Sequence, residues 1–285
     1  ILVDCLVVNG TDRVYGVPGE SYLAVLDALY GRNDIHYLNC RQEGGAAMAA
    51  EAYGKLTGRP GVCMVTRGPG ATNASAGVHV AFQDSTPMIL LIGQVGRNML
   101  EREAFQEIDY RRMFGQMAKW VAQIDDPARI PEFINRAYAT ATSGRPGPVV
   151  LALPEDMLRV SVAMPQLLPA AKTVVPAPAA HDMSALAELL GTSRKPLLLV
   201  GGGGWTTAAS AHVTAFAEAN QVPVAASFRC QDYLDNEHPL YIGHVGIGID
   251  PNLARRIKSC DLLIVLGPRL GEMTTSNYTL LAPPQ

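Results

Sequence analysis

Short apolar runs alternate with longer amphipathic segments along most of the chain. The apolar runs are rich in Val, Ile and Leu, which is typical of strands in a parallel sheet that is covered on both faces. The segments between them place apolar residues at every third or fourth position, which predicts helices. Because strands and helices alternate regularly, the pattern predicts an α/β protein built from βαβ units.

The first part of the chain, residues 1–158, predicts a complete doubly wound domain with a mostly parallel sheet. We expect strands at 13–17, 35–38, 62–66, 88–92, 120–124 and 149–153. We expect helices at the start of the chain, ending at Gly10, and at 21–31, 44–56, 71–80 and 127–142. The polar segment between residues 98 and 115 is expected to be irregular.

Residues 159–180 are rich in Pro and Ala and predict an extended linker, because such a segment cannot bury much apolar surface. A second, Rossmann-like α/β domain is expected over residues 181–285. Its predicted helices are 184–190, 207–219 and 251–258, and its predicted strands are 197–200, 222–226 and 262–266. An uncapped helix opens the chain and a strand shortly precedes its end, so we expect a piece of a longer protein with the second domain truncated.

The composition fits this fold and argues against several other classes of protein. Of 285 residues, 48% are hydrophobic, and the formal net charge of −3 provides no basic surface for nucleic acid or an anionic membrane. No apolar run reaches the roughly 18 residues of a membrane span, and no export signal is visible. The five cysteines have no paired spacing and the six histidines no metal-ligand spacing. We therefore expect buried thiols, no metal site on this chain and a cytoplasmic protein.

Glu43 is the most informative polar residue of the chain. It follows the strand expected at 35–38 and precedes the small-residue helix that begins at Gly44. Ligand crevices in open α/β sheets form where strands end, and the amino ends of helices are electropositive. The alternative is a first-turn glutamate that only complements the helix dipole, which is common.

Six segments, taken in order, resemble the amino-terminal half of the acetolactate synthase and pyruvate oxidase family of thiamine-diphosphate-dependent enzymes. The likeness is dense from about residue 14 to residue 154 and looser beyond. The segments are Arg41-Gln42-Glu43-Gly44-Gly45 and the helix after it, Thr66-Arg67-Gly68-Pro69-Gly70-Ala71-Thr72-Asn73, Phe82-Gln83-Asp84-Ser85-Thr86-Pro87, Gly93-Gln94-Val95, Ala104-Phe105-Gln106-Glu107, and Ser143-Gly144-Arg145-Pro146-Gly147-Pro148.

The resemblance implies two catalytic residues. Glu43 would hydrogen-bond the pyrimidine ring of thiamine diphosphate and favour the tautomer that removes the thiazolium C2 proton. A carboxylate can take this role only where burial raises its pKa enough for it to share a proton with the ring. Gln106 would be a hydrogen-bond donor on the substrate side of the site. Its position in an irregular segment also fits an ordinary solvated glutamine.

The resemblance also implies cofactor-binding residues in two turns. Pro18 and Gly19 would line the central part of the cofactor, although a Pro-Gly pair also fits a plain β-turn. Pro69 and Asn73 would pack around the pyrimidine. The glycines beside Pro69 invite a phosphate-loop interpretation, but the turn lacks the Lys and the spacing of a Walker loop.

The sequence leaves flavin binding open. The glycine run of the second domain contains Gly202 and Gly203 as candidate residues for FAD or another nucleotide, but the G-x-G-x-x-G spacing fails. By resemblance, Arg145 matches an arginine that contacts FAD in the family. Two segments, at 243–246 and 268–275, depart from the family's flavin pattern. We expect no tightly bound flavin.

The resemblance implies a whole enzyme that decarboxylates a 2-keto acid and transfers the bound aldehyde fragment, and therefore a transferase or lyase. A benzaldehyde-lyase-like enzyme and a simple 2-keto acid decarboxylase would use the same residues and remain alternatives. A third alternative, from another class, is a non-catalytic nucleotide-binding α/β protein. The acid at position 43 argues against it, because such a protein has no use for a carboxylate there.

The family binds Mg²⁺ and the diphosphate through a Gly-Asp-Gly segment in a third domain, and the present sequence contains no Gly-Asp-Gly. The resemblance therefore places the Mg²⁺ ligands outside this chain, and we expect the chain alone to be inactive. It also implies a homodimer or homotetramer that assembles through the first domain. The Gly- and Ala-rich face of the helix expected at 44–56 suits close packing across such an interface.

Overall fold

The computed structural model describes residues 1–281 and divides the chain into two compact units, Ile1–Val175 and Pro176–Gln285. Part of the segment expected as a linker is bound to the first unit, since Asn135 donates to the Pro169 carbonyl oxygen at 2.7 Å and the Ala171 N–H donates to Asn9 at 3.0 Å. The domain boundary that we expect from the sequence, at residue 158, stays a prediction. Within residues 1–281, no helix combines the length and apolar character needed to cross a bilayer.

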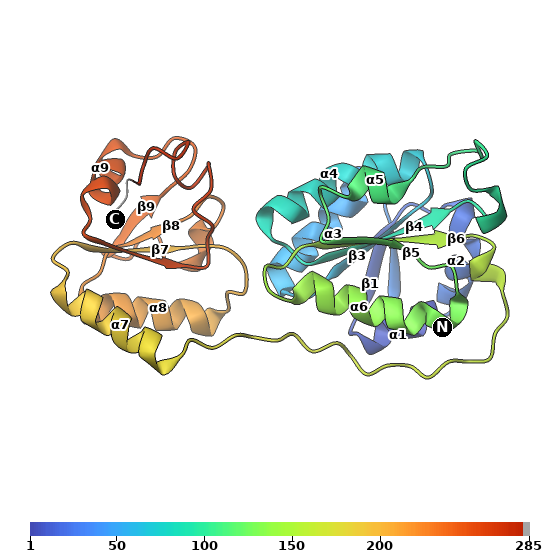
Figure 1. Ribbon diagram of the computed structural model, residues 1–285, viewed down its shortest axis with the longest axis horizontal. Coiled ribbons are helices and arrows are strands. Elements are labelled where there is room, and N and C mark those ends of the chain that lie inside the picture. The colour runs from blue at the N-terminus through green and yellow to red at the C-terminus, as the bar shows by residue number, and fades with distance from the viewer. Residues whose placement is uncertain (282–285) are drawn as a thin grey trace. The chain divides into compact units, whose positions relative to one another are not determined.

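The first unit contains a six-stranded parallel sheet in the order β2-β1-β3-β4-β6-β5 (Figure 1). The central strands β3, β4 and β6 are buried at every position, which explains their continuous apolar sequence. The strand bounds are β1 Arg13–Gly16, β2 His36–Asn39, β3 Gly61–Val65, β4 Met88–Gln94, β5 Trp120–Gln123 and β6 Pro148–Pro154.

Helices cover both faces of this sheet, so the expected doubly wound fold is confirmed. One group packs its apolar side chains on one face: α1 Leu2–Val8, α2 Leu23–Leu29 and α6 Ile130–Thr142. The other group packs on the opposite face: α3 Glu43–Thr57, α4 Pro69–Asp84 and α5 Tyr110–Phe114. Figure 1 shows the sheet between these two layers.

The small-residue face of α3 is buried inside the first unit, against α4. Ala46, Ala47 and Ala50 are fully buried, and a Cβ added to Gly77 of α4 would lie 2.5 Å from the Ala47 Cβ. Side chains this small let two helix backbones approach closely. This face is therefore not free to pair with a second copy of the chain, and it no longer supports the expected oligomer.

The second unit contains a four-stranded parallel sheet in the order β10-β7-β8-β9, with helices on both faces. Helices α7 and α8 pack on one face and α9 on the other. The helices are α7 Ala180–Thr192, α8 Thr207–Asn220 and α9 Pro251–Ser259, and the strands are β7 Pro196–Val200, β8 Val224–Ala226, β9 Tyr241–His244 and β10 Leu262–Leu266.

Three local features differ from expectation. The helix expected from residue 21 begins at Leu23, because Glu20–Tyr22 form a 3-10 turn and the Ser21 hydroxyl bonds Thr66 at 2.8 Å instead of capping a helix. The segment expected to be irregular contains α5, whose first turn is capped by Asp109. Strand β9 was not expected, because its four half-buried residues carry no clear alternation of apolar and polar positions.

Candidate functional site

The first sheet reverses its winding direction between the neighbouring strands β1 and β3. Strand β1 connects through α2 to β2 on one side, whereas β3 connects through α4 to β4 on the other. Ligands of open α/β sheets bind at the carboxyl ends of the strands at such a switch point. Pro18 and Gly19 lie in the loop after β1, Glu43 begins α3 after β2, and Pro69 and Asn73 lie at the start of α4 after β3.

Glu43 is the first residue of α3 and is half-buried. Its helix begins there because the side chain of Gln42 accepts a hydrogen bond from the Gly45 N–H at 2.9 Å, which caps the first turn. The Asn73 side-chain amide donates to Glu43 Oε2 at 2.9 Å, and no other hydrogen bond to this carboxylate comes from residues 1–281. The carboxylate is thus oriented through one oxygen and available through the other.

Two glycines allow neighbouring segments to pack closely on Thr66, next to Glu43. A Cβ added to Gly70 would lie 3.6 Å from Glu43 Oε1 and 2.8 Å from Thr66 Cγ2. A Cβ added to Gly19, in the loop after β1, would lie 2.5 Å from the Thr66 Cβ. Both segments therefore need glycine to approach Thr66 this closely. We call this close packing of Gly19 and Gly70 on Thr66, beside the Glu43 carboxylate, the glycine cradle.

Gln106 lies against the turn that follows β3, so it belongs to the same cluster of loops. A Cβ added to Gly68 would lie 2.7 Å from the Gln106 Cβ. The backbone of Gln106 is left-handed, with φ 65°, a conformation that side-chain-bearing residues adopt only where their surroundings impose it. The Gly68 N–H donates to the Tyr110 hydroxyl at 2.9 Å, which attaches α5 to the same turn.

Two tyrosines hold the loop that carries Pro18 and Gly19. The Tyr22 hydroxyl donates to the Val17 carbonyl oxygen and lies 3.1 Å from the Tyr37 hydroxyl. Burial raises the pKa of both phenols, that of Tyr37 to about 12, so both remain neutral donors at ordinary pH. Pro18 itself is exposed and Gly19 half-buried, which leaves the tip of this loop accessible.

Arg67 is a member of this cluster that sequence reasoning did not single out. It is 8% exposed and bonds Glu20, Glu155 and the carbonyl oxygen of Phe105. The only signal in the sequence was an arginine directly after a buried strand, and its partners lie up to 88 positions away. Such partners are visible only once the strands are placed side by side.

The structure does not bring Arg145 into this cluster. The residue precedes β6 and so lies at the amino edge of the first sheet, opposite to Glu43. Its guanidinium donates to the Ser85 hydroxyl at 2.7 Å and to the Phe82 carbonyl oxygen at 2.6 Å, where α4 ends. A cation at the carboxyl end of a helix stabilises the helix dipole, so the visible role of Arg145 is that of a helix cap.

The glycine run after β7 makes contacts within the second unit. The Tyr233 hydroxyl donates to the Gly202 carbonyl oxygen at 2.6 Å, and the Trp205 indole N–H donates to the preceding carbonyl at 2.7 Å. The two rings stack with centroids 4.8 Å apart. Gly202 has φ 73°, which explains a glycine there, whereas Gly203 is exposed. We call this arrangement of Trp205 and Tyr233 on the glycine run the aromatic clasp.

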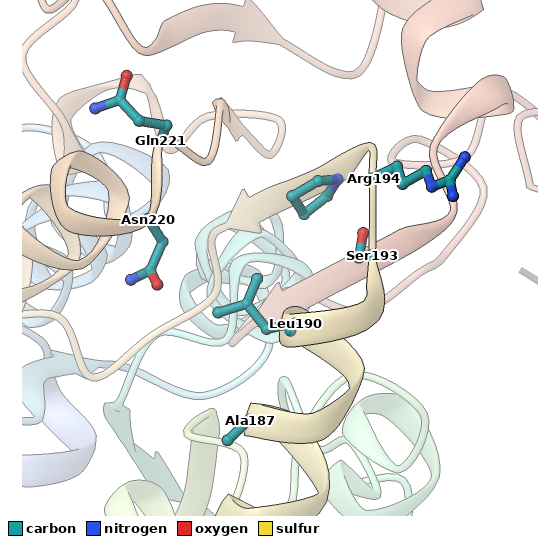
Figure 2. A pocket seen from close by; sticks show the side chains of 8 residues that line it. Ala187, Leu190, Ser193, Arg194, Asn220 and Gln221 are labelled. Carbon is teal, nitrogen blue, oxygen red and sulfur yellow. The ribbon is translucent and has the colours of Figure 1, made fainter.

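A cavity of about 480 Å³ also lies in the second unit, at the amino edge of its sheet. Figure 2 shows Asn220, Gln221 and Leu190 around it. The amide groups of Asn220 and Gln221 donate to backbone carbonyls of α8, so neither amide nitrogen is aimed at a ligand. Within residues 1–281, no group of three or more His, Cys, Asp or Glu side chains could hold a metal ion.

Comparison with known proteins identifies the family of this chain. The family model "Thiamine pyrophosphate enzyme, N-terminal TPP binding domain" matches residues 1–113, and "Thiamine pyrophosphate enzyme, central domain" matches residues 183–285. A probable acetolactate synthase large subunit of Methanocaldococcus jannaschii is 34% identical over 288 aligned positions, which cover 99% of this chain and 49% of the relative.

Two further relatives have similar names. The acetolactate synthase large subunit of Corynebacterium glutamicum is 34% identical over 95% of this chain and 44% of its own length. The acetolactate synthase isozyme 2 large subunit of Escherichia coli is 32% identical over 99% of this chain and 51% of its own length. The chain thus spans about half the length of the curated relatives that it matches.

Proposed function

Because the chain belongs to the thiamine pyrophosphate enzyme family, of which it carries the N-terminal and central domains, we propose that it is the amino-terminal part of an acetolactate-synthase-like enzyme. The whole enzyme would release CO₂ from one 2-keto acid and join the remaining fragment to the carbonyl carbon of a second. The relatives' names support the reaction class. The observation that carries the proposal is the Glu43–Asn73 pair in its glycine cradle at the switch point of the sheet.

Thiamine diphosphate, when bound, would supply a thiazolium carbon that is nucleophilic once deprotonated. Glu43 would hold a proton between Oε1 and a nitrogen of the cofactor's pyrimidine, while Asn73 keeps Oε2 in place. Pro69 would pack against the pyrimidine, and Pro18 and Gly19 against the middle of the cofactor. These assignments are supported by the close packing of Gly19 and Gly70 on Thr66, next to the Glu43 carboxylate.

Gln106 would donate a hydrogen bond to the substrate. Its support is its placement against Gly68, in the same cluster of loops as Glu43. A donor in a fixed position stabilises negative charge that develops on a substrate oxygen, because it needs no reorganisation when the charge forms.

We place the diphosphate and Mg²⁺ ligands outside this chain, in a third domain of the longer protein. The sequence lacks Gly-Asp-Gly, and Mg²⁺ needs oxygen ligands in near-octahedral geometry. A homodimer or homotetramer would let that domain of one subunit meet the first unit of another. Five free cysteines support a reducing, cytoplasmic location.

We propose that no flavin is held tightly by these residues. The aromatic clasp uses the carbonyls of the glycine run, and Arg145 is engaged at the end of α4. The glycine run also lacks the G-x-G-x-x-G spacing of a dinucleotide turn, so Gly202 and Gly203 do not match that motif.

The products of the longer protein test the proposed function. Purified protein with thiamine diphosphate, Mg²⁺ and pyruvate should release CO₂ and form acetolactate. Free acetaldehyde without acetolactate would favour a simple decarboxylase, and cleavage of benzoin to benzaldehyde would favour a lyase. Release of neither CO₂ nor aldehyde from a panel of 2-keto acids and acyloins would contradict the proposal and favour a non-catalytic protein.

A further inference from the structure

Arg67 joins three separate segments at the carboxyl edge of the first sheet. It directly follows Thr66 and the end of β3, and its guanidinium uses three different nitrogens. Nη2 lies 3.0 Å from Glu20, which follows β1, and Nη1 lies 3.1 Å from Glu155, which follows β6. Nε donates to the carbonyl oxygen of Phe105 at 3.2 Å. No lysine could reach three acceptors in these directions, because an ammonium group lacks the planar fork of arginine.

The three contacts differ in strength because their exposure differs. The Arg67 side chain is 10% exposed, that of Glu155 26% and that of Glu20 64%. Water screens an exposed ion pair, so the contact with Glu20 contributes little by itself. The contact with Glu155 is better shielded, and it anchors Arg67 to the end of β6, which is separated from β3 by β4. The bond to Phe105 is then made by a side chain that is already fixed.

This last bond fixes the segment that ends in Gln106. Arg67 Nε holds the carbonyl immediately before Gln106, and the adjacent Gly68 packs against the Gln106 backbone. The left-handed conformation of Gln106 costs free energy unless neighbouring groups impose it. Farther back, the segment is held to itself by Glu107, whose carboxylate accepts from the N–H of Glu101 at 2.7 Å.

We propose that Arg67 is a positioning residue that sets the Gln106 segment relative to Glu43. It touches neither of these two side chains in any hydrogen bond of residues 1–281, and it acts through the Phe105 carbonyl and through Glu155. This inference rests on the proposed function, because it concerns the same site. The inference also has a structural part, which is that one buried guanidinium orders the segment. This part can be tested without an activity assay.

The chain offers a matched control. Arg32 also bridges two carboxylates, Asp4 at 2.7 Å and Asp34 at 2.7 Å, but it lies before β2, at the opposite edge of the sheet. Its side chain is 29% exposed. Arg32→Gln therefore removes a double ion pair of the same kind without touching the candidate site.

Hydrogen exchange of this chain provides the first test. In Arg67→Gln, peptides over residues 98–108 should exchange roughly tenfold faster or more, the change expected when one charge-assisted hydrogen bond is lost locally. Peptides over β3 and β4 should be unchanged. Arg32→Gln should leave residues 98–108 unchanged. Equal exchange in Arg67→Gln and the wild type, or acceleration over the whole first unit, would overturn the proposal.

Glu155→Gln is the milder second variant, since it keeps the guanidinium and its bond to Phe105. It should accelerate hydrogen exchange of the same peptides by less than Arg67→Gln does.

In the longer protein, Arg67→Gln should lower kcat by roughly tenfold while the affinity for thiamine diphosphate changes little, because Glu43 and Asn73 remain in place. Arg67→Lys should restore only part of kcat. An equal loss of cofactor affinity would show a general structural role. Inactive wild-type protein would contradict the proposed function, whereas the exchange data would still decide the role of Arg67.

Discussion

The Asn73 side chain donates to the carboxylate of Glu43 at 2.9 Å, although thirty positions separate the two residues. The contact exists because α3 and α4 pack closely through Ala47 and Gly77 and both begin at the same edge of the sheet. One helix therefore carries the acid, and its neighbour carries the group that orients it. A first-turn glutamate that served only the helix dipole would not need a dedicated amide.

Replacement of Glu43 by Gln should lower turnover of the longer protein by roughly 10² to 10⁴, the scale of a lost acid–base step. The substitution keeps the shape of the side chain and an oxygen that can accept from Asn73, so folding and cofactor binding should persist. Steady-state kinetics and the circular dichroism spectrum measure the two effects. Turnover near that of the wild type would show that Glu43 is not the acid of this site.

Glu132 provides the control for this experiment. It is also a first-turn glutamate, at the start of α6, and it pairs with the exposed Arg129 at 2.6 Å. Glu132→Gln removes a first-turn charge of the same kind, and at this exposed position water screens its interaction with the helix dipole. Turnover of this variant should match the wild type, so that a loss in Glu43→Gln can be assigned to its place beside Asn73.

The present chain alone should bind thiamine diphosphate weakly or not at all. The diphosphate carries most of the charge of the cofactor, and we place its Mg²⁺ ligands outside this chain. Among the residues expected around the cofactor in the first unit, Pro18, Gly19, Glu43, Pro69 and Asn73, none is a cation that could pair with the diphosphate. Calorimetry with cofactor and Mg²⁺ measures the affinity. Binding in the micromolar range would mean that the diphosphate ligands lie on this chain after all.

The sheet and the position of Glu43 could be predicted because both depend on local sequence. The buried strands β3, β4 and β6 are continuous apolar runs, and Glu43 follows a strand and precedes a helix whatever the rest of the fold does. The contacts of Arg67 could not be predicted in this way. They join residues 47 and 88 positions apart, and they depend on the order of the strands in the sheet.

The face of α3 illustrates a different difficulty. A stripe of Gly and Ala indicates that something packs closely, but it does not say whether the partner is a helix of the same chain or a second subunit. The structure gives α4 as the partner. The FAD contact expected of Arg145 came from the resemblance alone. Its contacts at the end of α4 depend on the left-handed turn at Ser85, which the local sequence does not predict.

The second unit should lose stability in acid through Asp261. The Ser193 hydroxyl and the backbone N–H groups of Arg194 and Lys195 donate to this carboxylate and lower its pKa from 3.8 to about 2. A depressed pKa in the folded state means that the contribution is fully present above the unfolded pKa near 4 and is lost as the pH falls toward 2. Asp261→Asn should therefore unfold at lower denaturant at pH 7, and its difference from the wild type should shrink below pH 4.

Tryptophan fluorescence can follow the second unit separately. The chain has two tryptophans, and Trp120→Phe leaves Trp205 as the reporter. Urea unfolding of this background and of the same background with Asp261→Asn, at several pH values, gives the required comparison. A difference that stays constant from pH 7 to pH 3 would show that the hydrogen bonds to Asp261 do not depend on its charge.

The purified longer protein should carry no tightly bound flavin. The aromatic clasp holds the glycine run in one conformation, because Trp205 and Tyr233 donate to its carbonyls and stack on each other, and the run lacks the G-x-G-x-x-G spacing of a dinucleotide turn. A shift of the run to fit a dinucleotide would break these part-buried hydrogen bonds, and a typical intramolecular hydrogen bond contributes about 0.5–1.5 kcal/mol. The protein should therefore be colourless, and FAD added to the Trp120→Phe variant should leave the fluorescence of Trp205 unchanged. A stoichiometric yellow chromophore, or quenching of Trp205 that saturates at one FAD per chain, would show that the clasp opens and that the second unit is a flavin site.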